Sequence, residues 1–394
     1  MLTKWVLAFC LGIVSCSKFR VVQQWQYIDY EFRSPEEREA AISSGNYQKT
    51  AAFPIDVDRW NDKTFVTVIR SSGVPSSLNV VSRRVGKGGP LLRPYPDWSW
   101  TTTNCSGIVS VFRVAIDRCN RIWVLDTGKI DSEKVCPAQL LIFDLHTSKL
   151  VKRVIIPDNI ANDKNGKGML VTPVLEVHGR HCDNVTAYLG DSDGYAIIVY
   201  NLADSSLERV SSSALLSDPR ATTYTIEGQS FELADGPVGM AFSPSTRKLY
   251  LSPMSSYNLV SVPTRDFRLY RGDQVPFQVN NIFSTQASAK AISKKGALFF
   301  GLVNSTSIGC WNEFREPSKD NVVTVARNPE TLQFTSGMKI KKLSSRAHTR
   351  EQLLILTNRF QKLATGTVNP NEVNFRIQVA DVDKLIGNTL CMPP

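Results

Sequence analysis

Histidine is scarce in this sequence, and no long hydrophobic run follows its first residues. Only four histidines occur among 394 residues. The chain also lacks the H-E-x-x-H and phosphate-loop motifs, and it has no C-x-x-C pair. These motifs therefore give no indication of a zinc protease, a nucleotide-binding enzyme or a zinc finger. We accordingly predict no metal site and no cofactor.

The first residues have the pattern of a secretory signal peptide, residues 1–17. Lys4 supplies a positive charge, residues 5–14 are apolar, and small residues follow at Ser15 and Ser17. This apolar stretch is shorter than the roughly 20 residues that a membrane helix needs. Charged or amide residues interrupt every later apolar run. We therefore expect residues 18–394 to be secreted, to be extracellular and to have no membrane span.

Two of the eight cysteines fall within the predicted signal peptide, which leaves six. An even number is typical of disulfide-bonded secreted proteins. Four cluster early and two lie far along the chain: Cys105, Cys119, Cys136, Cys182, Cys310 and Cys391. Many pairings are possible. We predict pairing within each group, with Cys310 bonded to Cys391; a buried pair of free thiols is the alternative.

Three N-x-S/T tripeptides, at Asn104, Asn184 and Asn304, agree with export and predict glycosylation. The formal net charge is +10, and no block of five like charges occurs. A basic extracellular protein is suited to acidic matrix or to anionic small molecules. We expect no nucleic-acid partner and consider extracellular matrix or cuticle as a possible partner.

Six short apolar runs recur along the chain, each in the pattern of a β-strand. They cover residues 65–69, 122–125, 186–189, 248–251, 297–300 and 352–356. A polar turn precedes each run, and another apolar run precedes most of the turns, as in a hairpin. The spacing of roughly 50–65 residues is typical of propeller blades of three or four strands. The sequence thus predicts an all-β fold, a six-bladed β-propeller forming one domain. A β-sandwich with a second domain is the alternative.

One short N-terminal helix is expected at residues 33–44. Ser34 and Glu37 form a capping box with Pro35 at the first helical position, and Gly45 follows as a stop. We expect this helix to lie as a lid across one end of the ring.

Several segments resemble the yellow/major royal jelly protein family of insects. The most specific are Trp-Val-Leu-Asp-Thr-Gly at residues 123–128 and Gly-Cys-Trp-Asn at residues 309–312. Further similar segments cover residues 22–30, 42–47, 114–122, 136–145 and 373–377. The resemblance covers essentially the whole mature chain and implies a six-bladed propeller.

The resemblance implies several functions, because the family includes proteins linked to cuticle pigmentation, dopachrome-converting members, amine-binding salivary proteins and royal jelly storage proteins. It also implies that Asn312 and Phe314 face the channel, where an amide and an aromatic ring suit an indole or catechol. The segment around Ala297 is apolar where the amine binders carry a hydroxyl group, which departs from their pattern.

Aspartates near predicted strand ends are a second set of candidates. Asp126, Asp191, Asp193 and Asp235 each lie close to a glycine. A carboxylate near the channel would pair with a cationic amine, although aspartate beside glycine is also ordinary turn chemistry. We take Asp235 and Asp191 as candidate ligand-binding residues and identify no catalytic residue.

Three classes of function remain open. The favoured one is a secreted protein that binds a small aromatic amine or quinone in its channel, with a role in pigmentation or melanin formation. The alternatives are a dopachrome-converting isomerase, in which a modest base would assist proton loss, and a structural or storage protein.

Overall fold

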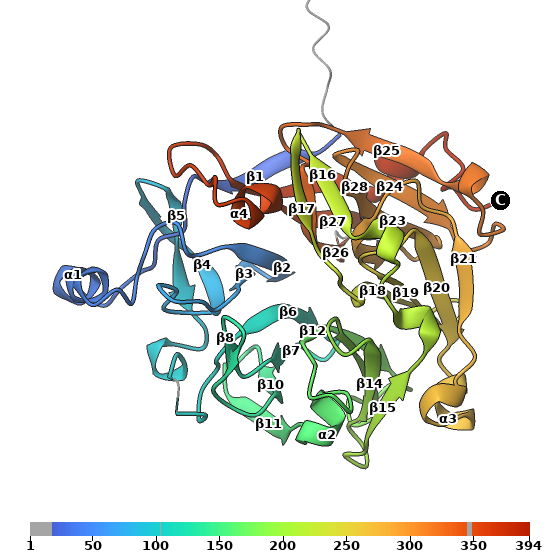
Figure 1. Cartoon of the computed structure of the whole chain (residues 1–394), viewed down its shortest axis with the longest axis horizontal. Coiled ribbons are helices and arrows are strands. Elements are labelled where there is room, and N and C mark those ends of the chain that lie inside the picture. Colours follow the sequence, from blue (N-terminus) through green and yellow to red (C-terminus); the bar gives the residue numbers. More distant parts are fainter. Residues whose placement is uncertain (1–17, 103, 345–348) are drawn as a thin grey trace, which may run out of the picture.

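Six four-stranded antiparallel sheets form a closed ring around a central channel (Figure 1). The structure is a computed structural model that describes residues 18–102, 104–344 and 349–394. The predicted six-bladed β-propeller is therefore confirmed. The predicted signal peptide lies outside the described residues.

The first three blades follow one another along the chain. The first contains β2 (Pro54–Trp60), β3 (Lys63–Val68), β4 (Leu78–Gly86) and β5 (Gly89–Pro94). The second contains β6 (Val111–Ile116), β7 (Arg121–Asp126), β10 (Gln139–Asp144) and β11 (Leu150–Ile155). The third contains β12 (Leu170–Val177), β13 (Val185–Asp191), β14 (Ala196–Asn201) and β15 (Leu207–Ser211).

The last three blades complete the ring. The fourth contains β18 (Pro237–Ser243), β19 (Lys248–Pro253), β20 (Asn258–Pro263) and β21 (Gln278–Asn281). The fifth contains β22 (Ala287–Ile292), β23 (Ala297–Leu302), β24 (Ser307–Asn312) and β25 (Val323–Arg327). The sixth contains β26 (Phe334–Ser344), β27 (Thr349–Asn358), β28 (Phe375–Asp381) and, at its edge, β1 (Arg20–Trp25).

Smaller elements decorate the ring. Two hairpins are β8 (Lys129–Ile130) with β9 (Glu133–Lys134) and β16 (Thr223–Ile226) with β17 (Gln229–Glu232). The helices are α1 (Pro35–Ser43), α2 (Asp158–Ala161), α3 (Asp266–Leu269), α4 (Phe360–Ala364) and α5 (Val382–Ile386). Single 3₁₀ turns cover Trp98–Trp100, Ser213–Leu215, Pro219–Ala221, Gly272–Gln274 and Lys319–Asn321.

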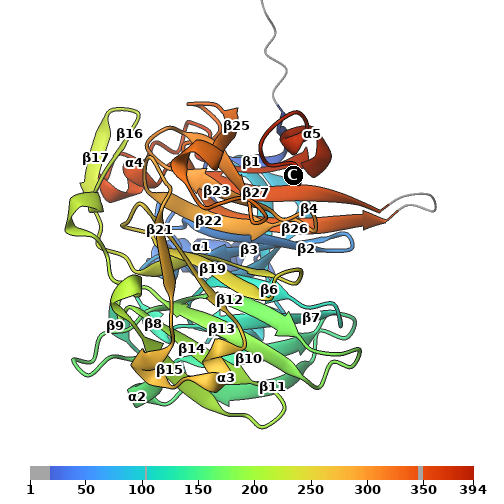
Figure 2. The same cartoon turned by 90° about the vertical axis from the view of Figure 1, so that its right-hand side faces the viewer.

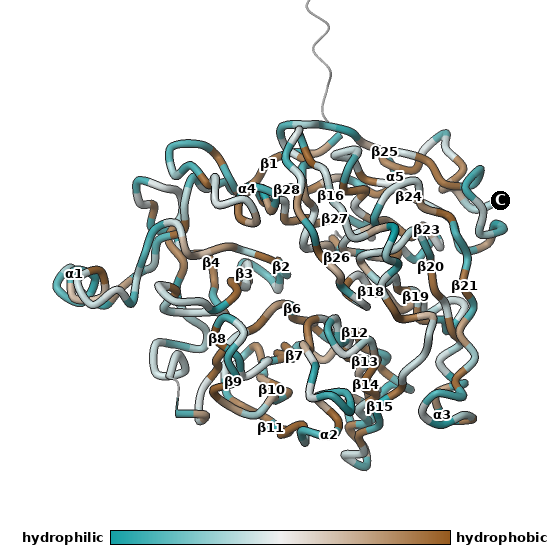
Figure 3. The backbone as a smooth tube through the Cα atoms, in the orientation of Figure 1, coloured by the Kyte–Doolittle hydropathy of each residue, from teal (hydrophilic) through white to brown (hydrophobic). Residues whose placement is uncertain are grey.

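The six apolar runs identified in the sequence are the second strands of the six blades, β3, β7, β13, β19, β23 and β27. These strands are apolar because each is sandwiched within a sheet whose two faces pack on neighbouring blades. In Figure 3, hydrophobic residues gather along the blade strands, and the peripheral loops are mostly hydrophilic. No helix among the described residues is long and apolar enough to cross a membrane.

The first and last strands close the ring within one blade. β1 pairs antiparallel with β28, in a register that places Trp25 opposite Phe375. Trp25 is 1% exposed, and its Nε1 donates a hydrogen bond of 2.6 Å to the carbonyl oxygen of Pro90 in the first blade. The N-terminal segment thus joins the last blade to the first.

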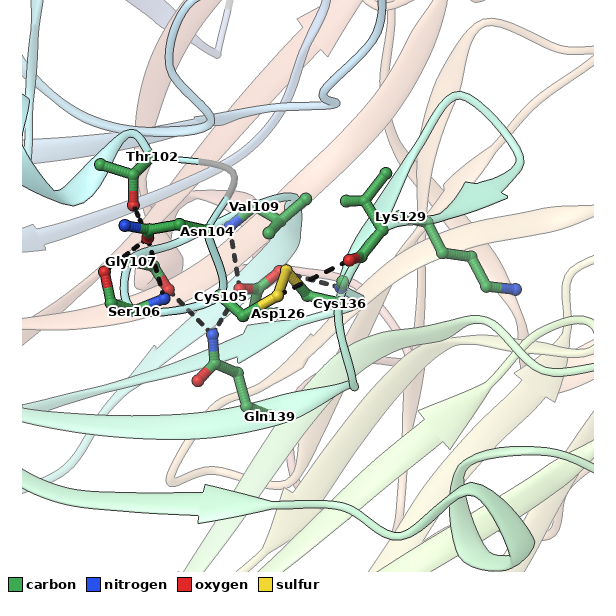
Figure 4. The surroundings of a disulfide bond; sticks show 12 residues. Thr102, Asn104, Cys105, Ser106, Gly107, Val109, Asp126, Lys129, Cys136 and Gln139 are labelled. Carbon is green, nitrogen blue, oxygen red and sulfur yellow. Dashed lines mark hydrogen bonds between the residues drawn. A yellow bond between two sulfur atoms is a disulfide. The ribbon is translucent and has the colours of Figure 1, made fainter.

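Three disulfides are present, and the prediction of pairing within each group is confirmed. They are Cys105–Cys136, Cys119–Cys182 and Cys310–Cys391. Cys119–Cys182 links the second and third blades, and Cys310–Cys391 ties the C-terminal segment to β24. Figure 4 shows the first, beside which Oδ1 of Asn104 accepts hydrogen bonds from Thr102 and Ser106.

The expectation that the N-terminal helix covers the ring is wrong. Helix α1 begins as predicted, with Ser34 Oγ accepting from the Glu37 backbone N–H at 3.2 Å. It lies, however, at the outer edge of the molecule beyond the first blade (Figure 1). None of its residues is buried, so it has no apolar face with which to cover the channel.

Candidate functional site

The central channel contains two chambers that share Arg113 and Val238 in their walls. Arg113, on β6, lines both chambers and is 6% exposed. Its Nη2 donates to the carbonyl oxygen of Ser336 at 2.9 Å, and its Nη1 lies 3.5 Å from Thr172 Oγ1. Because these contacts come from β26 and β12, the guanidinium spans the channel between opposite blades.

The first chamber, which we call the apolar chamber, has a volume of about 200 Å³. It lies at the N-terminal ends of the inner strands. Its apolar wall consists of Ile55, Phe112, Met169, Val171, Leu233, Val238, Met254, Phe334 and Phe360. Besides Arg113, its charged groups are Asp193 and Asp235.

The cover of the apolar chamber comes from the connection between the third and fourth blades and from the sixth blade. The hairpin β16–β17 and helix α4 lie together at one end of the ring (Figure 2). Phe360 of α4 packs on Phe231 of β17, with ring centroids 5.4 Å apart, and stacks on Phe334 at 5.0 Å. Gln229 Nε2 also donates to Thr367 Oγ1 at 3.0 Å. The hairpin and α4 thus cover the end of the channel, a role that we had expected for the N-terminal helix.

Asp235 has an unusual environment for a carboxylate. Burial raises its pKa to about 7, with a further increase from Asp193 and an opposing effect from Arg113. Its backbone N–H donates to Ser255 Oγ at 3.0 Å. Within the described part of the chain, no hydrogen bond or ion pair reaches its carboxyl oxygens. A ligand cation in the chamber would therefore meet an unpaired acid in largely apolar surroundings.

Asp191 has a different role from Asp235. Its carboxylate accepts hydrogen bonds from the backbone N–H groups of Met169 and Gly194, at 2.6 and 3.0 Å, and pairs with Arg209 at 2.7 Å. Asp126 similarly accepts from the N–H groups of Val109 and Ser110. Carboxylates that are satisfied in this way hold the ends of β13 and β7 in place, and Asp191 does not line either chamber.

Asn312 and Phe314 also lie away from both chambers. Asn312 ends β24, the third strand of its blade, and its Nδ2 donates to the carbonyl oxygens of Lys295 and Cys391 at 3.1 and 2.8 Å. The side chain of Phe314 is 49% exposed. The structure therefore brings neither residue together with Asp235.

The second chamber, which we call the lysine chamber, has a volume of about 370 Å³. It lies at the C-terminal ends of the inner strands. Its charged side chains are Arg113, Asp56, Asp58, Lys290, Lys339 and Lys341. In the sequence, Arg113 and Lys290 interrupt the apolar stretches of predicted inner strands, but no motif marks them as functional.

Comparison with known proteins identifies the family of this chain but names no ligand for either chamber. Residues 109–391 match the model of the family described as Major royal jelly protein. The chain belongs to this family. It is 52% identical over 385 residues to major royal jelly protein 9 of Apis mellifera, across 95% of this chain and 90% of that relative.

Other royal jelly proteins of Apis mellifera match over their full length. Major royal jelly protein 8 is 47% identical over 417 residues, covering 99% of this chain and 100% of the relative. Major royal jelly protein 1 is 44% identical over 421 residues, covering 100% and 97%. The resemblance found in the sequence is thus confirmed, and these names state no ligand.

Proposed function

We propose that this protein is a secreted binding protein that holds a small aromatic amine or quinone in the apolar chamber. The observation that carries the proposal is the unpaired carboxyl group of Asp235 in an aromatic-walled cavity. An ammonium group would pair with Asp235, and the ring would pack against Phe334 and Phe360. A charge-assisted hydrogen bond of this kind contributes about 1.5–3 kcal/mol.

Secretion is part of the proposal. Disulfides persist in oxidising compartments, and three occur here. The sequon residues Asn104, Asn184 and Asn304 are all exposed, so each can carry a glycan. The excess of basic residues would favour contact with acidic matrix such as cuticle.

Asp235 also favours a second candidate, a dopachrome-converting isomerase. A general base is most effective when its pKa lies near the working pH, and the pKa of Asp235 is about 7. In this reaction the carboxylate would remove a ring proton of dopachrome. The electron pair left behind would rearomatise the ring and pass to a quinone oxygen, which would take up a proton from the protonated carboxyl group or from water. Either candidate would place the protein in the chemistry of amines and pigments.

Calorimetric titration with serotonin and dopamine, together with dopachrome absorbance, tests both candidates. We expect saturable amine binding that Asp235→Asn weakens at least about tenfold, since the charged contact is lost. Because an ammonium ligand binds the ionised acid, affinity should fall by up to about tenfold for each pH unit below 7.

Two aromatic substitutions locate the site. Phe360→Ala should weaken amine binding, and Phe314→Ala, at an exposed position outside the chamber, should leave it unchanged. Dopachrome loss above the spontaneous rate, abolished by Asp235→Asn, would favour the isomerase. Neither binding nor turnover would refute both candidates and favour a structural or storage role.

A further inference from the structure

The lysine chamber holds more positive than negative charge. Four cationic side chains line it, Arg113, Lys290, Lys339 and Lys341, against the two carboxylates Asp56 and Asp58. Lys339 Nζ lies 2.7 Å from Asp56 Oδ2, and Lys341 Nζ lies 2.6 Å from Asp58 Oδ1. These two ion pairs use both carboxylates of the chamber, and no ion pair within the described ranges reaches Arg113 or Lys290.

Both unpaired cations are deeply buried. Lys290 is 4% exposed and Arg113 is 6% exposed. Among the described residues, the hydrogen bonds of Lys290 Nζ all go to neutral acceptors, namely Ser252 Oγ at 2.5 Å and the carbonyl oxygens of Ala287 and Ser288 at 3.3 and 3.2 Å, and Nζ lies 5.2 Å from the centroid of the Phe283 ring. Arg113 Nε is buried without a hydrogen-bond partner among the described residues. Burying a charge is unfavourable unless an opposite charge compensates it.

The backbone leaves space for the Lys290 ammonium group. Gly239 on the adjacent inner strand β18 faces it, and a Cβ atom there would lie 3.0 Å from Lys290 Nζ and 2.2 Å from the carbonyl oxygen of Ser288. Any larger residue would therefore push the lysine or the strand away. The glycine keeps this position open beside the chamber.

The rest of the chamber wall is mostly apolar. It includes Ile116, Val174, Leu175, Met240, Phe242 and Met338. The side chains of Lys339 and Lys341 are 20% and 21% exposed, so the chamber is accessible from solvent on their side. An occupant that suits these surroundings has one anionic group and an apolar body.

We propose that the lysine chamber is a second binding site, for a small organic anion whose head group lies between Lys290 and Arg113 and whose apolar body contacts the inner strands. This site is distinct from the amine site, because the two chambers lie at opposite ends of the inner strands and share only Arg113 and Val238 among their lining residues. Anion binding does not require an amine at Asp235, but Arg113 lines both chambers and interacts electrostatically with Asp235.

The affinity of the lysine chamber for an anion should depend on pH, because Lys290 can lose its proton. Burial and the nearby Arg113 lower its pKa to about 7. The other charged groups that line the chamber are the two ion pairs Asp56–Lys339 and Asp58–Lys341. An anion binds the ammonium form, so its affinity should fall as pH rises above 7. Amine binding at Asp235 should change in the opposite direction.

The test is calorimetric titration of the full-length protein with octanoate and, separately, with octan-1-ol, which has the same chain without the charge. We expect octanoate to bind at one site per chain and octan-1-ol to bind at least about tenfold more weakly. Lys290→Met should weaken octanoate binding at least about tenfold. Equal affinity for both compounds, or no octanoate binding at millimolar concentration, would overturn the proposal.

Matched variants separate this site from the amine site and from misfolding. Lys342→Met changes an exposed lysine of β26, the strand that carries Lys339 and Lys341, and should leave octanoate binding unchanged. Lys290→Met should keep the near-ultraviolet circular dichroism spectrum and the serotonin affinity, while Asp235→Asn keeps octanoate binding. Unchanged octanoate binding in folded Lys290→Met would refute the site, whereas loss of serotonin binding alone would concern only the amine proposal.

Discussion

At the scale of single residues, hydrogen-bond partners separate aspartates that look alike in sequence. Asp126, Asp191 and Asp235 all lie near strand ends and glycines. The first two are saturated by backbone N–H groups or arginine, and Asp235 faces a cavity. The sequence identified aspartates at strand ends as candidates. It could not show which of them would be satisfied, because the hydrogen-bond donors come from other segments whose positions were not predictable.

The raised pKa of Asp235 makes its stability contribution depend on pH. Its protonated form is favoured in the folded chain, so this contribution is complete below the ordinary value of 3.8 and is lost as pH rises through about 7. Asp235→Asn is neutral at every pH. At pH 8 it should therefore raise the free energy of unfolding by about 1–4 kcal/mol, measured by urea denaturation.

Two comparisons control this prediction. The gain should shrink toward zero at pH 4, where the wild-type carboxyl group is protonated in both states. Asp320→Asn, at an exposed position, should give no pH-dependent gain. A destabilised Asp235→Asn at pH 8 would show that the carboxylate is favourably solvated or paired.

At the scale of elements, the sequence predicted the blade strands correctly but not which elements cover the end of the channel. All six second strands were identified, because burial on both faces of a blade requires apolar runs. Helix α1 was also located within two residues of each end. Its expected place across the ring was wrong. The cover is instead formed by contacts among Phe231, Phe334 and Phe360, which are distant in the sequence and meet only in the folded ring.

The Cys310–Cys391 bond is the element-scale feature that most directly stabilises the C-terminal region. It joins two fully buried residues 81 positions apart. In the chain-entropy description, a loop of this size contributes about 4 kcal/mol by restricting the unfolded chain. The double variant Cys310→Ala, Cys391→Ala should lower the free energy of unfolding by about that amount in denaturant titrations.

The Cys105–Cys136 bond provides the matched comparison. Its loop of 31 residues is shorter, and Cys105 is exposed, so the corresponding double variant should lose less stability. Equal losses would show that loop length does not determine these contributions.

At the scale of the whole molecule, six-fold recurrence predicted the ring, but the contents of its channel were not predictable. The channel depends on which inner-strand side chains point to the axis and at what depth. Arg113 lines both of its chambers, with acidic groups in the apolar chamber and excess positive charge in the lysine chamber. Neither the composition nor the spacing of motifs indicates how deep in the channel a given side chain lies.

Ring closure by β1 is a property of the whole molecule, because each blade packs against two neighbours. Deleting residues 18–25 would remove Trp25 and its contact with Pro90 and would expose the edge of β28, an aggregation-prone feature. We expect a lower Tm, aggregation, and loss of serotonin and octanoate binding together, since both chambers require the closed ring. Deleting the exposed residues 392–394 should change none of these. Retention of both ligands by the β1 deletion would show that the remaining blade contacts suffice to hold the channel.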